Sequence, residues 1–179
     1  MKTIYFLLIC VWLGLITGDV FAQPPIQKEY RNETYTVYGW TTSLKADTYT
    51  TVINNKNTLK TKDLGDWCTS NVNESGVALH SMIKSVLPSE KRKIFASDIR
   101  IMNCSFYYDA VTGQILNVEF HLKGVMLSEK EESLTAVTLK EIHQIEILFK
   151  KHCFNIDCDS SKYKYGFVIF RFRLDKMAD

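Results

Sequence analysis

Residues 101–123 read IMNCSFYYDAVTGQILNVEFHLK, and this stretch decides the fold. On both sides of a turn at 109–114, apolar side chains occupy every second position. Before the turn they are Met102, Cys104, Phe106 and Tyr108, and after it they are Leu116, Val118, Phe120 and Leu122. An alternation with period two is typical of a strand with one buried face, and Gly113 supplies the positive backbone angle that such turns often need. The stretch therefore predicts a β-hairpin that buries one face.

The segment after the hairpin predicts the main helix. Thr138 is followed three residues later by Glu141, which is a capping-box pattern at a helix start. Over 138–153, one sector at helical spacing is apolar and contains Ile142, Ile145, Leu148, Phe149 and Cys153. We expect this apolar side to pack on the buried face of the hairpin.

The segments further out complete the predicted domain. A helix over 76–87 ends at Pro88, and a shorter helix over 89–95 presents its charged residues 90–93 outward and Phe95 inward. The segments 34–42, 48–53 and 163–174 are rich in the β-branched and aromatic residues that are typical of strands. The chain is therefore predicted to fold as one α+β domain over 33–179, a mostly antiparallel sheet with two main helices on one face.

The N-terminal 22 residues have the composition of an export signal. Lys2 precedes an apolar run, and Val20-Phe21-Ala22 offers small residues at a cleavage site, so we expect cleavage after Ala22. An uncleaved membrane anchor or a lipid-modified form is the alternative. Residues 23–32 contain two prolines and three charged residues, which predicts a flexible lead-in. The expected mature protein is periplasmic or extracellular, without a stable membrane span after cleavage.

The charge and cysteine content narrow the class of protein. The formal net charge is only +2, which gives no electrostatic case for a nucleic-acid partner. Cys68, Cys104, Cys153 and Cys158 remain after the leader, and export permits up to two disulfides with three possible pairings. We favour Cys153 with Cys158, and Cys68 with Cys104 follows by elimination. The alternative for Cys104 is a small buried core residue.

The sequence contains no recognisable catalytic motif. It has no Gly-x-Ser-x-Gly elbow and no phosphate-binding loop, and it nominates no catalytic residue, cofactor or metal ligand set. His143 and Glu146 are neighbours on the predicted helix, but Glu146 is interpreted as an exposed partner of Lys150 four residues on. Paired carboxylates of the glycosidase type remain an alternative without nominated residues.

Aromatic residues in the N-terminal strands are the strongest indication of a binding surface. The candidate residues are Tyr35, Tyr38, Trp40 and Tyr49, together with Phe167, Ile169 and Arg171 on the outward side of the last strand. Exposed aromatic residues on a sheet often contact sugars or proteins, although packing inside the domain is the alternative. The leading hypothesis is an exported, non-enzymatic binding module for an envelope protein or a glycan. A glycan-acting hydrolase with unidentified carboxylates is the second hypothesis.

Two resemblances add to this interpretation. From 76 to 174 the order helix, hairpin, long helix and final strand resembles the C-terminal domain of TonB-type energy-transduction proteins. The residues that carry it are the turn 109–114, the helix 138–153 and the strand 167–174. This resemblance implies that the edge over 167–173 accepts a strand from a partner. The whole chain is similar to small exported proteins of unassigned function in Bacteroides-type bacteria, which implies a periplasmic or secreted location.

Overall fold

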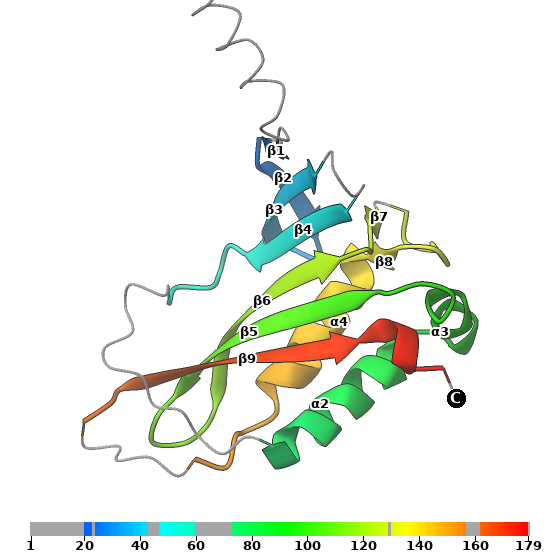
Figure 1. The fold of residues 1–179 in the computed structure, drawn as a ribbon. Helices are drawn as coiled ribbons and strands as arrows, with labels where there is room; N and C mark the ends of the chain where they lie inside the picture. The colour runs from blue at the N-terminus through cyan, green and yellow to red at the C-terminus, as the bar shows by residue number, and fades with distance from the viewer. Residues whose placement is uncertain are drawn as a thin grey trace, which may run out of the picture.

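The computed structural model describes residues 20–22, 24–42, 47–59, 73–128, 130–156 and 162–178. These residues form a mixed α+β fold with helices on a mainly antiparallel sheet, as the sequence predicts (Figure 1). In chain order the elements are β1 (Val20–Ala22), β2 (Ile26–Tyr30), β3 (Glu33–Thr42), β4 (Asp47–Asn54), α2 (Asn73–Val86), α3 (Ser89–Phe95), β5 (Ile101–Asp109), β6 (Ile115–Lys123), β7 (Leu127–Ser128), β8 (Val137–Thr138), α4 (Leu139–Lys150), β9 (Tyr165–Arg173) and the 3-10 helix η2 (Leu174–Lys176).

The large sheet has the strand order β1-β3-β4-β6-β5-β9, and all its pairings are antiparallel. Strands β1 and β2 both pair with β3, β1 along 40–42 and β2 along 33–37. Among the described strands, β9 therefore forms the opposite edge of the sheet. The small strands β7 and β8 pair in parallel in a second sheet.

The predicted hairpin is present as β5 and β6. Asp109 ends β5, and its Oδ1 accepts hydrogen bonds from the backbone N–H groups of Val111 and Thr112. Gly113 has φ +72°, and a Cβ at this position would collide with the Phe154 carbonyl. A register shift near Tyr107 and Tyr108 changes the alternation at the start of β6. Ile115 is consequently buried there, in place of the predicted Leu116.

Helices α2 and α4 pack on one face of the sheet, and the predicted capping box at Thr138 and Glu141 is present. The shared core contains apolar residues from both helices, Leu79, Ile83, Ile142, Ile145 and Phe149. Phe149 packs edge-to-face on Phe106 of the hairpin, with ring centroids 5.1 Å apart. The inner face of the hairpin therefore lies under α4, as expected.

The charged run of α3 points outward only in part, because Glu90 and Lys93 are exposed whereas Lys91 and Arg92 are buried. The Lys91 side chain is almost fully buried, and its Nζ lies 2.6 Å from Glu141 Oε1 and donates to the Ala136 carbonyl. A carboxylate and further hydrogen-bond acceptors offset the free-energy cost of burying an ammonium group. Lys91 thus connects α3 to the first turn of α4, a contact between residues 50 positions apart.

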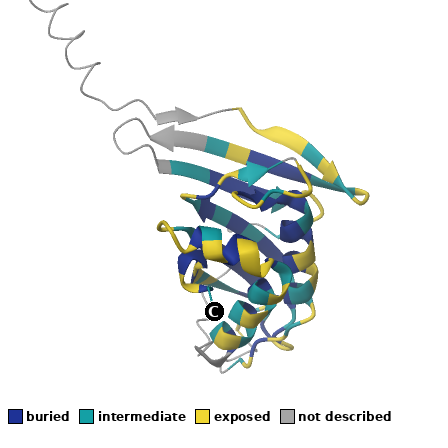
Figure 2. Cartoon of the chain, turned by 90° about the vertical axis from the view of Figure 1, so that its right-hand side faces the viewer, coloured by how far each residue is buried: buried dark blue, intermediate teal, exposed yellow. Residues whose placement is uncertain are grey.

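The predicted flexible lead-in at 23–32 contains strand β2. Its five residues pair in register with β3, from Ile26 opposite Val37 to Tyr30 opposite Glu33. The strand and the turn after it are largely exposed in Figure 2. Arg31 and Asn32 adopt positive φ in that tight turn. The prolines therefore precede the strand and do not prevent it, because Pro24 and Pro25 lie outside the paired residues.

The described cysteines differ from the predicted pairing. Cys104 is a free thiol buried in the core, and Cys153 is a free, exposed thiol. Their expected partners, Cys68 and Cys158, lie outside the described residues. Cys104 corresponds to the alternative of a small core residue, since its side chain shares the inner face of β5 with Phe106. Within the described ranges, none of the helices has both the length and the apolarity to cross a membrane.

Candidate functional site

The candidate site is the sheet face opposite α2 and α4, which we call the open face. Strand register places its residues, because directly opposite residues in paired strands project to the same side. On β3, β4, β5, β6 and β9 the described side chains on this face include Tyr38, Tyr49, Thr51, Asn103, Ser105, Glu119, His121, Lys123, Phe167, Ile169 and Arg171. The open face is therefore polar at its centre and carries apolar residues toward both ends.

Most of the predicted binding residues lie on the open face. Tyr38 is 39% exposed and Ile169 is 58% exposed, Arg171 is exposed, and Tyr49 and Phe167 are half-buried. Trp40 is the register partner of Tyr49. Tyr35 was predicted on the same surface, and this prediction is wrong. Its side chain is fully buried on the inner face. Residues 35 and 38 are three positions apart along β3, so their side chains point to opposite faces of the sheet.

One row of register partners crosses five strands of the open face. It runs from Tyr38 through Thr51, His121 and Asn103 to Arg171, and we call it the central row. The Arg171 Nε donates to Asn103 Oδ1 at 3.3 Å. The central row thus brings residues of both predicted aromatic regions onto one surface.

His121 holds the middle of the central row through both ring nitrogens. Its Nδ1 lies 3.1 Å from Thr51 Oγ1, and its Nε2 lies 3.2 Å from Ser105 Oγ. Glu119 Oε2 is 3.9 Å from Nε2. Burial lowers the pKa of His121 below its usual value, so the imidazole is neutral at pH 7. The pKa of Glu119 is raised, because burial has a larger effect than the hydrogen bond with Tyr107, which lowers it.

A hollow of about 270 Å³ adjoins the central row, and we call it the basic hollow. Its lining includes Tyr49, Thr51, Asn103, His121, Lys123 and Arg171. The Lys123 ammonium lies 5.4 Å from the centroid of the Tyr49 ring. Sequence reasoning did not find Asn103, His121 and Lys123 as site residues, because they come from two strands whose order in the sheet had to be known first.

The outer edge of β9 borders the open face. Among the described strands, only β5 pairs with β9, along the whole of its nine residues. Antiparallel strands direct part of their N–H and C=O groups to each side, so β9 has backbone groups that face away from β5. The predicted position of this strand at an edge is therefore correct.

A second polar cluster lies on the inner side and contains two carboxylates. The Tyr35 hydroxyl donates to Glu33 Oε2 at 3.0 Å and to Glu146 Oε2 at 3.2 Å, and it lies 2.9 Å from His143 Nδ1. Asn54 Nδ2 donates to the same two carboxylate oxygens. Glu146 also pairs with Lys150 at 2.7 Å, as predicted, but its side chain is only 3% exposed and was predicted to be exposed.

This inner cluster does not have the geometry of a glycosidase. Such enzymes need space between the two carboxyl groups for a sugar bond and a water molecule. Here the Tyr35 hydroxyl and the Asn54 amide occupy the space between the carboxylates of Glu33 and Glu146. The cluster instead fastens β3 and β4 to α4.

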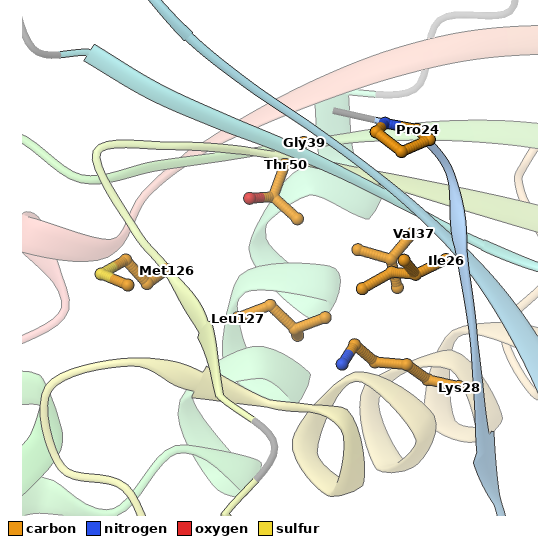
Figure 3. Close-up of a pocket in the computed structure, with 8 residues that line it drawn as sticks. All are labelled: Pro24, Ile26, Lys28, Val37, Gly39, Thr50, Met126 and Leu127. Atoms are coloured by element: carbon orange, nitrogen blue, oxygen red, sulfur yellow. The ribbon is translucent and has the colours of Figure 1, made fainter. Parts of the chain in front are cut away.

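A third feature is a hollow of about 210 Å³ between β2, β3 and β7 (Figure 3). Its labelled side chains are mainly apolar, with Val37, Ile26 and Leu127 facing one another and the Lys28 amine at one side. Its described lining contains one charged group, Lys28, and no acid–base pair. The open face therefore offers more polar atoms to a ligand than this hollow does.

Comparisons with known proteins bear on the fold alone. No protein-family model matches the chain, and no curated protein matches it. A solved structure of a DUF5043 family protein from Bacteroides uniformis is similar, with a TM-score of 0.56 and 14% identity over 87% of this chain and 89% of that chain. This likeness agrees with the expected similarity to uncharacterised proteins of Bacteroides-type bacteria. The resemblance to TonB-type domains is not shown by these comparisons.

Proposed function

We propose that this chain is an exported, non-enzymatic binding module that captures an extended segment of an envelope protein along β9. The observation that carries the proposal is the position of β9 at the sheet edge, with β5 as its only neighbour among the described strands. A strand added to such an edge gains main-chain hydrogen bonds, and its alternate side chains give specificity.

The side chains of β9 define the partner segment. Ile169 is 58% exposed, with half-buried Phe167 on one side and exposed Arg171 on the other. The strand contains two arginines and no acidic residue. A complementary segment therefore places apolar residues beside Phe167 and Ile169 and an acidic residue beside Arg171.

Export is supported by the composition of residues 1–22, which combine a basic start, an apolar run and a small-residue site at Ala22. An envelope partner follows from that location, because a strand-capturing surface meets the proteins of its own compartment. The binding step itself requires no catalytic group.

Peptide binding to the chain 23–179 tests strand capture. The probes are immobilised extended peptides with alternating apolar residues followed by one acidic residue, and a set with the acidic residue replaced by lysine. We expect binding of the acidic set and protection of β9 amides from hydrogen exchange. Ile169→Pro should abolish binding, because proline cannot donate to a ladder and distorts the edge.

Ile26→Pro is the matched control, since Ile26 is also an exposed isoleucine in an outer strand, at the far side of the sheet. It should leave peptide binding unchanged if both variants keep the circular dichroism of the parent. Arg171→Glu should reverse the preference toward the lysine-containing set. Unchanged binding by a folded Ile169→Pro variant would overturn the proposal.

A further inference from the structure

The basic hollow combines cationic and neutral hydrogen-bonding groups. Lys123 from β6 and Arg171 from β9 supply two positive charges, and the described residues that line the hollow include no acidic one. Asn103 from β5 and Thr51 from β4 add an amide and a hydroxyl to the lining. A concave surface with two cations and several uncharged donors favours an anion over a neutral or cationic ligand.

The orientation of Arg171 strengthens this preference. Its Nε donates to Asn103 Oδ1, which fixes the plane of the guanidinium. This contact does not use the two terminal Nη groups. A planar guanidinium presents parallel N–H donors that match the two oxygens of a carboxylate, phosphate or sulfate. Lys123 is held over the Tyr49 ring at the other side of the same hollow.

His121 lies two residues before Lys123 on β6 and in the same row as Arg171, and it adds a titratable donor to the hollow. The described charged or titratable groups around it are Glu119 and Lys123 on its own strand, Tyr49 on β4 and Arg171 on β9. Its hydroxyl partners Thr51 and Ser105 are able to accept a hydrogen bond from each ring nitrogen. The protonated ring is therefore accommodated without moving a neighbour, and a bound anion would favour it.

The geometry points to an oxyanion-binding site in the basic hollow, in which Arg171 and Lys123 hold the carboxylate of an acidic sugar or a free phosphate. The shared chemistry is a compact group with two or more negatively charged oxygens. This site uses no backbone group of the β9 edge, although it shares the Arg171 side chain with the proposed strand-capture surface.

Isothermal titration of the chain 23–179 with sodium glucuronate, inorganic phosphate and glucose tests the site. We expect saturable binding of at least one anion and none of glucose. Lys123→Met and Arg171→Met should each weaken anion binding by about tenfold or more, since each removes a charge-assisted contact. Lys93→Met is the matched control, because Lys93 is an exposed lysine of α3, away from the open face.

The pH dependence provides a second measurement. Anion affinity should increase from pH 8 to pH 6 as His121 becomes protonated in the complex, and His121→Gln should remove this increase. Tighter glucuronate binding would assign an acidic sugar, and tighter phosphate binding would assign a free inorganic oxyanion. The absence of saturable anion binding at millimolar concentrations, or an equal loss in Lys93→Met, would overturn the proposal.

Discussion

Tyr35 shows how a single hydroxyl group joins separate parts of the protein. It contacts Glu33 at the start of β3 and both His143 and Glu146 on α4. Burial raises the pKa of Tyr35 well above its usual value, and the negative charges of Glu146 and Glu33 raise it further. The phenol therefore stays protonated and remains a hydrogen-bond donor to the two carboxylates.

Glu33 makes this cluster sensitive to acid. Partial burial raises the pKa of Glu33, but hydrogen bonds from Tyr35, Asn54 and Lys56 outweigh it and hold the pKa below 4.5. A carboxylate with a lowered pKa in the folded state stabilises the protein above pH 4.5, and this contribution is lost as the pH falls through the folded-state value. We expect Glu33→Gln to reduce the loss of unfolding free energy between pH 5 and pH 3, measured by urea titration. An unchanged pH profile would contradict this assignment.

Gly113 is required by the backbone at the hairpin turn. Its positive φ is unfavourable for alanine, and the added Cβ would meet the Phe154 carbonyl. Gly113→Ala should lower the free energy of unfolding by about 2 kcal/mol or more, measured by urea denaturation. Gly76→Ala is the control. Gly76 lies in α2, where alanine favours the helix, and the added Cβ would lie 3.4 Å from the Phe170 ring of β9. An equal loss in both variants would contradict the argument.

At the scale of elements, the buried pair of Lys91 and Glu141 connects two helices. Lys91→Met leaves the Glu141 carboxylate buried without its cation, and it should destabilise the fold by roughly 3–5 kcal/mol. Adding Glu141→Gln should recover part of the loss, because glutamine is neutral and still suits the capping box. Lys93→Met, on the exposed side of α3, should have little effect. Thermal and urea unfolding would measure all three, and a Lys91→Met variant as stable as the control would contradict the prediction.

The elements that were predicted correctly carry local signals. The hairpin has period-two alternation around a glycine turn, and α4 begins at a capping box, so both depend on residues that are near one another in sequence. The burial of Lys91 depends on Glu141, 50 positions away, and no local pattern encodes that pair. Leu116 was placed on the buried face because a register shift in a strand leaves no clear mark in the sequence.

The candidate site was predicted only in part for a similar reason. Alternation along a strand shows which residues share a face, but it does not show which strands become neighbours. Tyr38 and Arg171 could be proposed from their own strands, whereas His121 and Asn103 joined them only when the order of β4, β6, β5 and β9 was known. Tyr35 was placed on the wrong face because it was grouped with the other aromatic residues, although the alternation along β3 puts it on the face opposite to Tyr38.

At the scale of the whole molecule, the sheet continues further toward the N-terminus than the sequence indicates. Strand β2 pairs with β3 through five residues, and the Tyr30 ring lies 5.2 Å from the His143 ring of α4. Removing residues 23–32 from the chain 23–179 should therefore lower the free energy of unfolding by about 2 kcal/mol, through lost ladder hydrogen bonds and packing. Scanning calorimetry would measure the change in Tm. An unchanged Tm would show that this segment is dispensable.

Arg171 belongs both to the β9 strand and to the central row, and this double position has a consequence for the two proposed ligands. The row crosses five strands, a span of about 19 Å at the usual strand spacing, and it meets the sheet edge at this guanidinium. An acidic residue of a captured strand and an oxyanion in the hollow therefore compete for one cation. Thermodynamic linkage requires that each ligand weaken the other by the same factor, so the concentration of a small anion would set the threshold for capture of the protein partner.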